Sequence, residues 1–190
     1  DGGGGRVQRG CGAGCPTVRR GRDRARLAAG TLRTDGAEWG SGLGDAGVRY
    51  DLAPVADLVP AGNLAANAPI GQLGRGYGST REDVVENTTA VVQGMHDAGL
   101  VTATKHFPGL GNVTVNTDYG VAHDSVTTAD SQEVAVFADL LAQTDSVMVG
   151  SVVYDRIDPD HPAMFSPVIV EGLLREQLGF DKVIISDDLG

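Results

Sequence analysis

The stretch "STREDVVENTTAVVQGMHDAGLVTATKHF" (residues 79–107) joins a helix pattern directly to a strand pattern. Its first part predicts an amphipathic helix, because Ser79 or Thr80 can cap it, acidic residues occupy its first turn, and Val and Met recur at helical spacing. The apolar segment that follows, residues 100–107, predicts a strand. A helix followed at once by a strand is typical of an α/β protein.

The same alternation continues on both sides of this stretch. We expect a helix that ends at Gly47 and a short strand within residues 48–57. Further along, the expected elements are a helix over 130–143, a strand over 146–154, a helix over 166–179 capped by Ser166, and a strand over 182–186. Repeated strand, loop and helix predict a parallel sheet, and both an open doubly wound sheet and a (β/α)8 barrel fit this pattern.

Ionisable or polar side chains follow each of the four expected strands. They are Asp57 after the first, Lys105 and His106 after the second, Tyr154 and Asp155 after the third, and Asp187 and Asp188 after the fourth. In parallel α/β proteins, ligand chemistry gathers at the carboxyl ends of the strands. Taken singly, the Asp187–Asp188 pair could cap a helix and His106 could bond to local backbone. Because the pattern repeats, it favours an enzyme.

Composition argues against several other classes of function. The net charge is −10 and the pI is near 4.7, which disfavours nucleic-acid binding because phosphate needs a basic face. No apolar run approaches the roughly 18 residues of a membrane span. Cys11 and Cys15 have no two further ligands at suitable local spacing, so we expect no metal site.

Composition also changes sharply near residue 38. Residues 1–38 hold eight of the 15 basic residues and ten of the 28 glycines, with a charge of +4 against −14 for the rest of the chain. We therefore divide the chain into residues 1–38 and a folded domain over 39–190. The Gly- and Arg-rich part after residue 10 fits a flexible arm or GC-rich DNA read in the wrong frame, and we favour the second interpretation.

Several motifs together resemble glycoside hydrolase family 3, specifically its bacterial β-N-acetylglucosaminidase branch. "KHFPGLG" (105–111) is similar to the K-H-F-P-G-H-G of that branch, and "ISDDLG" (185–190) follows it at the expected place. Further matching segments are "DGGGGRVQR" (1–9), "DLAPVAD" (51–57), "NAPIGQLGRGYG" (67–78) and the stretch from 156 to 188. The resemblance covers residues 1–10 and about 38–190.

This resemblance implies a (β/α)8 barrel, of which the chain supplies the middle strands. It implies a retaining glycosidase that works through a covalent glycosyl-enzyme, with Asp187 as nucleophile and Asp188 as the fallback. The residues that it implies for contacts with sugar hydroxyls are Asp1, Arg75, Lys105 and His106. The expected partner is a carbohydrate, and neither a metal nor an organic cofactor is expected.

The acid/base position departs from the pattern of the branch. There, a His ends the K-H-F-P-G loop and pairs with an Asp two residues earlier, whereas the matching positions here are Asp118 and Asn116. We expect Asp118 to be the acid/base, since carboxylic acids serve this role in most glycosidases. His123, five residues further on, is the alternative.

The resemblance predicts an enzyme that removes terminal β-linked N-acetylglucosamine, for example from peptidoglycan fragments. The alternatives are a family 3 β-glucosidase and a sugar-binding relative that has lost turnover. We expect the isolated 190-residue chain to be inactive and prone to aggregation, because a barrel that lacks strands exposes sheet edges. Both the bacterial cytoplasm and the cell envelope fit as locations.

Overall fold

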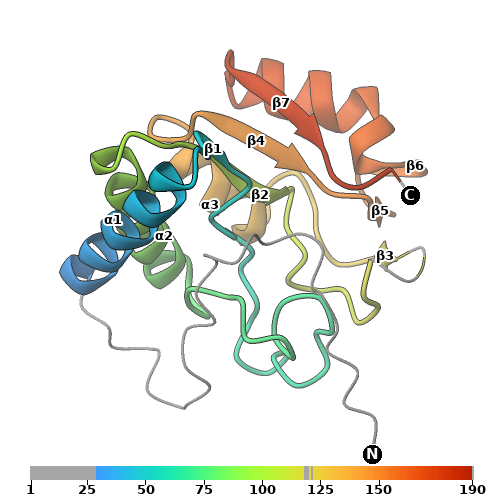
Figure 1. Cartoon of the computed structure of the whole chain (residues 1–190). Helices are drawn as coiled ribbons and strands as arrows, with labels where there is room; N and C mark the ends of the chain where they lie inside the picture. Colours follow the sequence, from blue (N-terminus) through green and yellow to red (C-terminus); the bar gives the residue numbers. More distant parts are fainter. Residues whose placement is uncertain (1–28, 118–119, 121, 190) are drawn as a thin grey trace, which may run out of the picture.

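The computed structural model describes residues 29–117, 120 and 122–189. Their centre is a four-stranded sheet in the order β1-β2-β4-β7 (Figure 1). Its strands are β1 (Tyr50–Asp51), β2 (Val101–Phe107), β4 (Ser146–Val149) and β7 (Val183–Ser186). Every neighbouring pair is parallel, so the carboxyl ends of the strands lie at one edge of the sheet. The parallel α/β architecture expected from the sequence is confirmed.

Helices follow the strands as the sequence predicts. The elements are α1 (Ala29–Asp45), α2 (Arg81–Asp97), α3 (Gln132–Leu140), the short 3-10 helix η2 (Ala163–Phe165) and the π-helix η3 (Val168–Gln177). Thr80 caps α2, and its side chain accepts a hydrogen bond from the backbone N–H of Asp83. Figure 1 shows α1 and α2 side by side. Since α1 begins at Ala29, this helix starts within the Gly- and Arg-rich part of the sequence.

The main hydrophobic core lies between the sheet and the helices. Phe107 at the end of β2 meets Phe137 of α3 edge to face, with ring centroids 5.3 Å apart. Both rings are fully buried, and burial of an aromatic side chain contributes about 1.5–3 kcal/mol. Leu174 of η3 belongs to the same buried cluster as Val147 of β4, so η3 contributes to this core. This core holds the end of β2 in place.

A second, smaller sheet corrects one prediction. It has the order β3-β5-β6, with β3 (His123–Asp124), β5 (Val153–Tyr154) and β6 (Asp158–Pro162). The single strand expected over 146–154 is therefore wrong, because this segment forms β4 and β5 in different sheets. At the break, Gly150 N–H donates to Phe107 O (2.9 Å) and Val153 N–H donates to Ala122 O (3.0 Å). Tyr154 consequently ends a strand of the smaller sheet, and Asp155 directly follows it.

At the amino-terminal ends of the strands, Asp145 ties α2 to the sheet. Its Oδ2 accepts hydrogen bonds from His96 Nε2 (2.7 Å), Thr102 N (2.8 Å) and Thr102 Oγ1 (2.9 Å). Burial alone would raise the pKa of Asp145, but the hydrogen bonds from His96 and Thr102 outweigh it and lower that pKa. The ionised form of Asp145 therefore stabilises the folded state.

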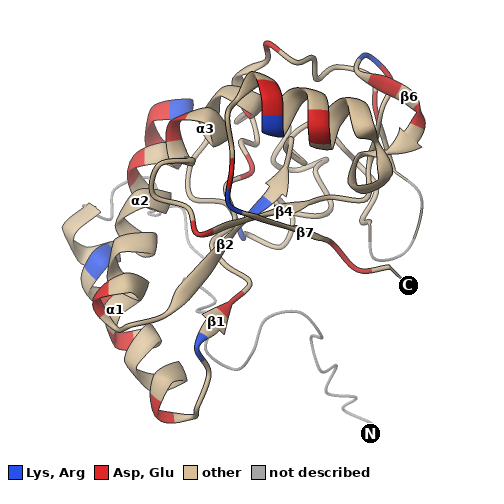
Figure 2. Ribbon diagram, turned by 90° about the horizontal axis from the view of Figure 1, so that it is seen from above, with Lys and Arg blue, Asp and Glu red and all other residues tan. Residues whose placement is uncertain are grey.

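Acidic residues outnumber basic ones, 25 to 15. Figure 2 shows Asp and Glu on α1, α2 and β6, with few Lys and Arg between them. Among the helices that the structure describes, none combines the length and apolarity that a bilayer crossing requires. Within the described residues, no group of three or more His, Cys, Asp or Glu side chains is placed to hold a metal ion.

Candidate active site

The carboxyl ends of β2, β4 and β7 bring the main candidate residues to one edge of the sheet. Phe107 pairs with Val149, and Val149 pairs with Ser186. One residue beyond β7, Asp187 N–H donates to Val149 O (2.9 Å). Because neighbouring strands lie about 4.8 Å apart, the backbones of His106 and Asp187 are roughly 10 Å apart. Both residues therefore lie at the same edge, on either side of the end of β4.

His106 is held by a buried carboxylate. Asp57 has no exposed surface. Its Oδ2 lies 2.7 Å from His106 Nδ1, and its Oδ1 accepts from His106 N (3.3 Å) and Leu110 N (2.8 Å). Two of these donors belong to His106 near the end of β2, and the third is Leu110 in the loop that follows. Asp57 therefore both orients the imidazole of His106 and fixes the start of the loop that contains Leu110.

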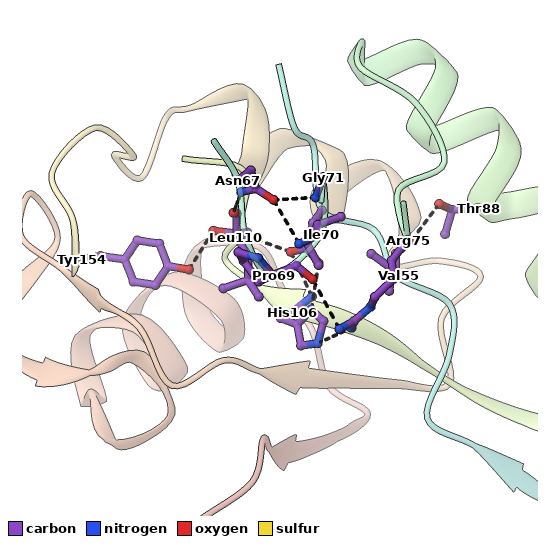
Figure 3. A network of polar contacts seen from close by, with 12 residues as sticks. Val55, Asn67, Pro69, Ile70, Gly71, Arg75, Thr88, His106, Leu110 and Tyr154 are labelled. Atoms are coloured by element: carbon purple, nitrogen blue, oxygen red, sulfur yellow. Dashed lines mark hydrogen bonds and ion pairs between the residues drawn. The ribbon is translucent and has the colours of Figure 1, made fainter. Parts of the chain in front are cut away.

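The other ring nitrogen of His106 faces a cation. His106 Nε2 lies 3.4 Å from Arg75 Nη2 (Figure 3). A guanidinium can only donate hydrogen bonds, so Nε2 must be the acceptor in this contact. The proton of a neutral ring then sits on Nδ1 and is donated to Asp57. The contacts thus select one tautomer of His106.

Lys105 lies beside this pair with its side chain mostly buried (6% exposed). It forms an isolated parallel bridge with Val55, which places it against the segment that leads to Asp57. Burial raises the pKa of nearby Asp51, and the positive charge of Lys105 partly opposes that rise. Lys105 and Arg75 supply the positive charge of this edge.

Two hydrogen bonds anchor the loop that follows His106. Tyr154 Oη donates to Gly109 O (2.8 Å), and Asn112 Nδ2 donates to Glu133 Oε1 (2.9 Å). Burial, and then the charges of Asp57 and Asp124, raise the pKa of Tyr154 well above its usual value, so the phenol stays protonated. At Gly111, a Cβ atom would lie 1.7 Å from Leu58 O, so only glycine allows this approach.

Asp187 is partly exposed and Asp188 is exposed. The backbone of Asp187 continues the pairing of β7 with β4, and its Oδ1 accepts a hydrogen bond from Asp188 N (2.9 Å). The structure thus places Arg75, Lys105, His106 and Asp187 along one edge. Asp1 and Asp118 lie outside the described residues, so their predicted roles stay predictions.

Two contacts of the site were not predicted from the sequence: that of Asp57 with His106 and that of Asp155 with His123. Asp57 was predicted only to follow the first strand, and its contact with His106 depends on the fold. His123 has a carboxylate partner, since its Nδ1 lies 2.9 Å from Asp155 Oδ1. Ser125 Oγ donates to the other oxygen of Asp155. These hydrogen bonds, from His123 first and then Ser125, lower the pKa of Asp155.

The fold and this polar edge define a domain of the TIM-barrel class. The sequence profile of the Glycosyl hydrolase family 3 N terminal domain matches residues 1–190. The chain belongs to this family. Its parallel sheet is therefore part of a (β/α)8 barrel, as the resemblance implied.

Individual relatives agree with the family assignment. The chain is 40% identical over 147 residues to a beta-hexosaminidase of Xylella fastidiosa (strain M23), covering 76% of this chain and 42% of that protein. The crystal structure of beta-N-acetylhexosaminidase from Beutenbergia cavernae DSM 12333 has a TM-score of 0.85 and 45% identity, covering 88% of this chain and 50% of that one. A family 3 beta-N-acetylglucosaminidase from Paenibacillus sp. str. FPU-7 has a TM-score of 0.76 and 32% identity, covering 85% of this chain and 31% of that one. The chain thus spans half or less of the length of these relatives.

Proposed function

We propose that the protein containing this chain is a retaining glycoside hydrolase that removes terminal β-linked N-acetylglucosamine. The observation that carries the proposal is the common edge on which Asp187 lies about two strand spacings from His106, beside Lys105 and Arg75. The names of the relatives, beta-hexosaminidase and beta-N-acetylhexosaminidase, support the choice of sugar. Peptidoglycan fragments are the proposed natural source of that sugar.

In this mechanism Asp187 attacks the anomeric carbon and forms a covalent glycosyl-enzyme while an acid protonates the departing oxygen. Water, deprotonated by the same group, then releases the sugar. Lys105 and Arg75 donate charge-assisted hydrogen bonds to sugar hydroxyls. His106 Nε2, the acceptor nitrogen of the ring whose Nδ1 donates to Asp57, accepts from a sugar hydroxyl in place of its long contact with Arg75 (3.4 Å). Asp1 is proposed as a further hydroxyl contact.

The acid/base has two candidates. Asp118 occupies the position of the loop that the resemblance assigns to this role. His123 is favoured by a specific observation, because Asp155 holds its Nδ1 while the imidazole remains 56% exposed. The lowered pKa of Asp155 keeps that carboxylate ionised, and an ionised carboxylate stabilises the imidazolium that an acid catalyst needs.

The two candidates are separable with the variants Asp118→Asn and His123→Gln. Loss of the acid slows substrates with poor leaving groups far more than aryl substrates with good ones, by about 10²–10⁴-fold. Added azide should restore turnover only in the variant that lacks the acid/base. A loss in His123→Gln alone that is large for poor leaving groups and small for aryl substrates would assign the role to His123 and reject Asp118, and the same pattern in Asp118→Asn alone would reject His123.

The function itself is tested on the full-length protein. We expect release of nitrophenol from the aryl β-N-acetylglucosaminide but not from the aryl β-glucoside, and Asp187→Asn should abolish this release while Asp188→Asn retains it. Cleavage of the glucoside instead would favour the β-glucosidase. Sugar binding without cleavage of either substrate would identify a sugar-binding relative.

A further inference from the structure

One buried amide joins the loop that carries Arg75 to the loop that follows His106 and β2. Asn67 is 1% exposed. It lies between the loop that leads to Arg75 and the loop that follows His106, as Figure 3 shows. No role in the proposed reaction falls on Asn67 itself, because its side chain is enclosed by protein.

The side-chain amide of Asn67 both donates and accepts hydrogen bonds. Its Nδ2 donates to the backbone oxygens of Leu110 (2.7 Å), Gly111 (3.2 Å) and Val113 (2.9 Å). Its Oδ1 accepts from the backbone N–H groups of Ile70 (3.0 Å) and Gly71 (2.8 Å). An amide is the side chain that donates and accepts at this length. A carboxylate at this position would meet three carbonyl oxygens without a proton to offer.

These contacts reach the charged groups in short steps. On one side, Arg75 N–H donates to Ile70 O (3.1 Å), within the turn that Asn67 Oδ1 holds. On the other side, Leu110 N–H donates to Asp57 Oδ1 (2.8 Å), the carboxylate that also holds His106. The two sides meet where Arg75 Nη2 lies 3.4 Å from His106 Nε2. A shift of either loop would therefore change this separation.

We propose that Asn67 is a positioning residue that sets the spacing of Arg75 and His106 and thereby the affinity of the site for its sugar. It acts through backbone groups of both loops and does not touch the sugar. The inference rests on the proposed function, since it assumes that Arg75 and His106 bind sugar hydroxyls. It predicts that damage at Asn67 appears mainly in KM.

The test compares Asn67→Asp with the control Asn63→Asp in the full-length protein. Asn63 is exposed, and its amide makes a long contact with Asn112 Oδ1 (3.4 Å). For Asn67→Asp at pH 7 we expect KM for the aryl β-N-acetylglucosaminide to rise roughly tenfold or more, with a smaller change in kcat, because buried polar groups lose their partners. The control should keep the wild-type KM.

The pH profile separates positioning from general damage. Below the raised pKa of the introduced buried carboxyl, its protonated form can donate to one carbonyl again. The defect in KM of Asn67→Asp should therefore shrink as the pH falls, whereas Asn63→Asp should follow the wild type throughout. A folded Asn67→Asp protein with the wild-type KM and pH profile would overturn the proposal.

A measurement on the wild-type protein tests the role of Asn67 independently of the variants. Binding of N-acetylglucosamine should slow hydrogen exchange at the amides of Ile70 and Gly71, because the sugar bridges the two loops that Asn67 joins. Unchanged exchange at both amides on binding would contradict the inference. If the protein bound no N-acetylglucosamine, the proposed function would fail. The role of Asn67 would then be judged by the His106 ring signals in NMR spectra, which must shift in Asn67→Asp and stay unchanged in Asn63→Asp.

Discussion

Replacement of Asp57 by Asn tests how the buried carboxylate organises the site. The change keeps the size of the side chain but exchanges one acceptor oxygen for an NH2 group. The carboxylate receives three hydrogen bonds, from His106 Nδ1 (2.7 Å), His106 N (3.3 Å) and Leu110 N (2.8 Å). The introduced NH2 group must then point at another hydrogen-bond donor, either His106 Nδ1–H or the backbone N–H groups of His106 and Leu110. The ring of His106 cannot resolve the conflict by changing tautomer, because a proton on Nε2 would face Arg75.

The expected loss of unfolding free energy in Asp57→Asn is about 1–3 kcal/mol, the cost of one buried donor without an acceptor. Urea denaturation of the full-length protein measures it, with the exposed Asp181→Asn as control. Nitrogen-15 NMR of the wild type should find the His106 proton on Nδ1. A proton on Nε2 in the wild type, or an unchanged unfolding free energy in Asp57→Asn, would refute the reasoning.

Three further predictions concern the framework of the site. Gly111→Ala should lower the unfolding free energy by about 1–3 kcal/mol, because the loop must move away from the carbonyl oxygen of Leu58. The control Gly62→Ala should not, since a Cβ atom there meets no atom within 4 Å. Equal urea midpoints for the two variants would contradict this prediction. Asp145→Asn should be less stable than the wild type at pH 7. Because the pKa of Asp145 is lowered in the folded protein, its contribution to stability is present above the ordinary value of 3.8 and is lost as the pH falls through the folded pKa. The acid denaturation curves of the two proteins should therefore converge at low pH. A difference in stability that persists there would contradict the stabilising role of ionised Asp145. Tyr154→Phe should cost about 1–3 kcal/mol in thermal or urea unfolding by leaving the carbonyl of Gly109 without its donor, and a stability equal to the wild type would mean that this bond contributes nothing.

The sequence predicted the main elements because their signals are local. The capped, amphipathic pattern of α2 and the apolar run of β2 need no knowledge of the rest of the chain. The split between β4 and β5 was missed for the opposite reason. Residues 146–154 are apolar throughout except for Gly150 and the serines, and only the different hydrogen-bonding neighbours on each side of the break separate the two strands.

The same distinction applies to the site. Lys105 and His106 lie near the end of β2 and Asp187 directly follows β7, so the strand pattern of the sequence was enough to predict that they share one edge of the sheet. Asp57 and Asn67 act through tertiary hydrogen bonds to backbone groups more than 40 residues away. Neither contact leaves a periodic signal in the sequence. The partner of His123 was hidden in the same way, because Asp155 directly follows β5, the strand that pairs with β3 in the smaller sheet.

The central claim is that Asp187 becomes covalently linked to the sugar during turnover. The most direct measurement incubates the full-length protein with a fluorinated N-acetylglucosaminyl donor that slows release of the sugar, followed by mass spectrometry of the intact protein and its peptides. We predict a mass increase of one glycosyl group, located on Asp187, and no increase in Asp187→Asn. Turnover without any glycosyl-enzyme, or a label on another carboxylate, would contradict the account.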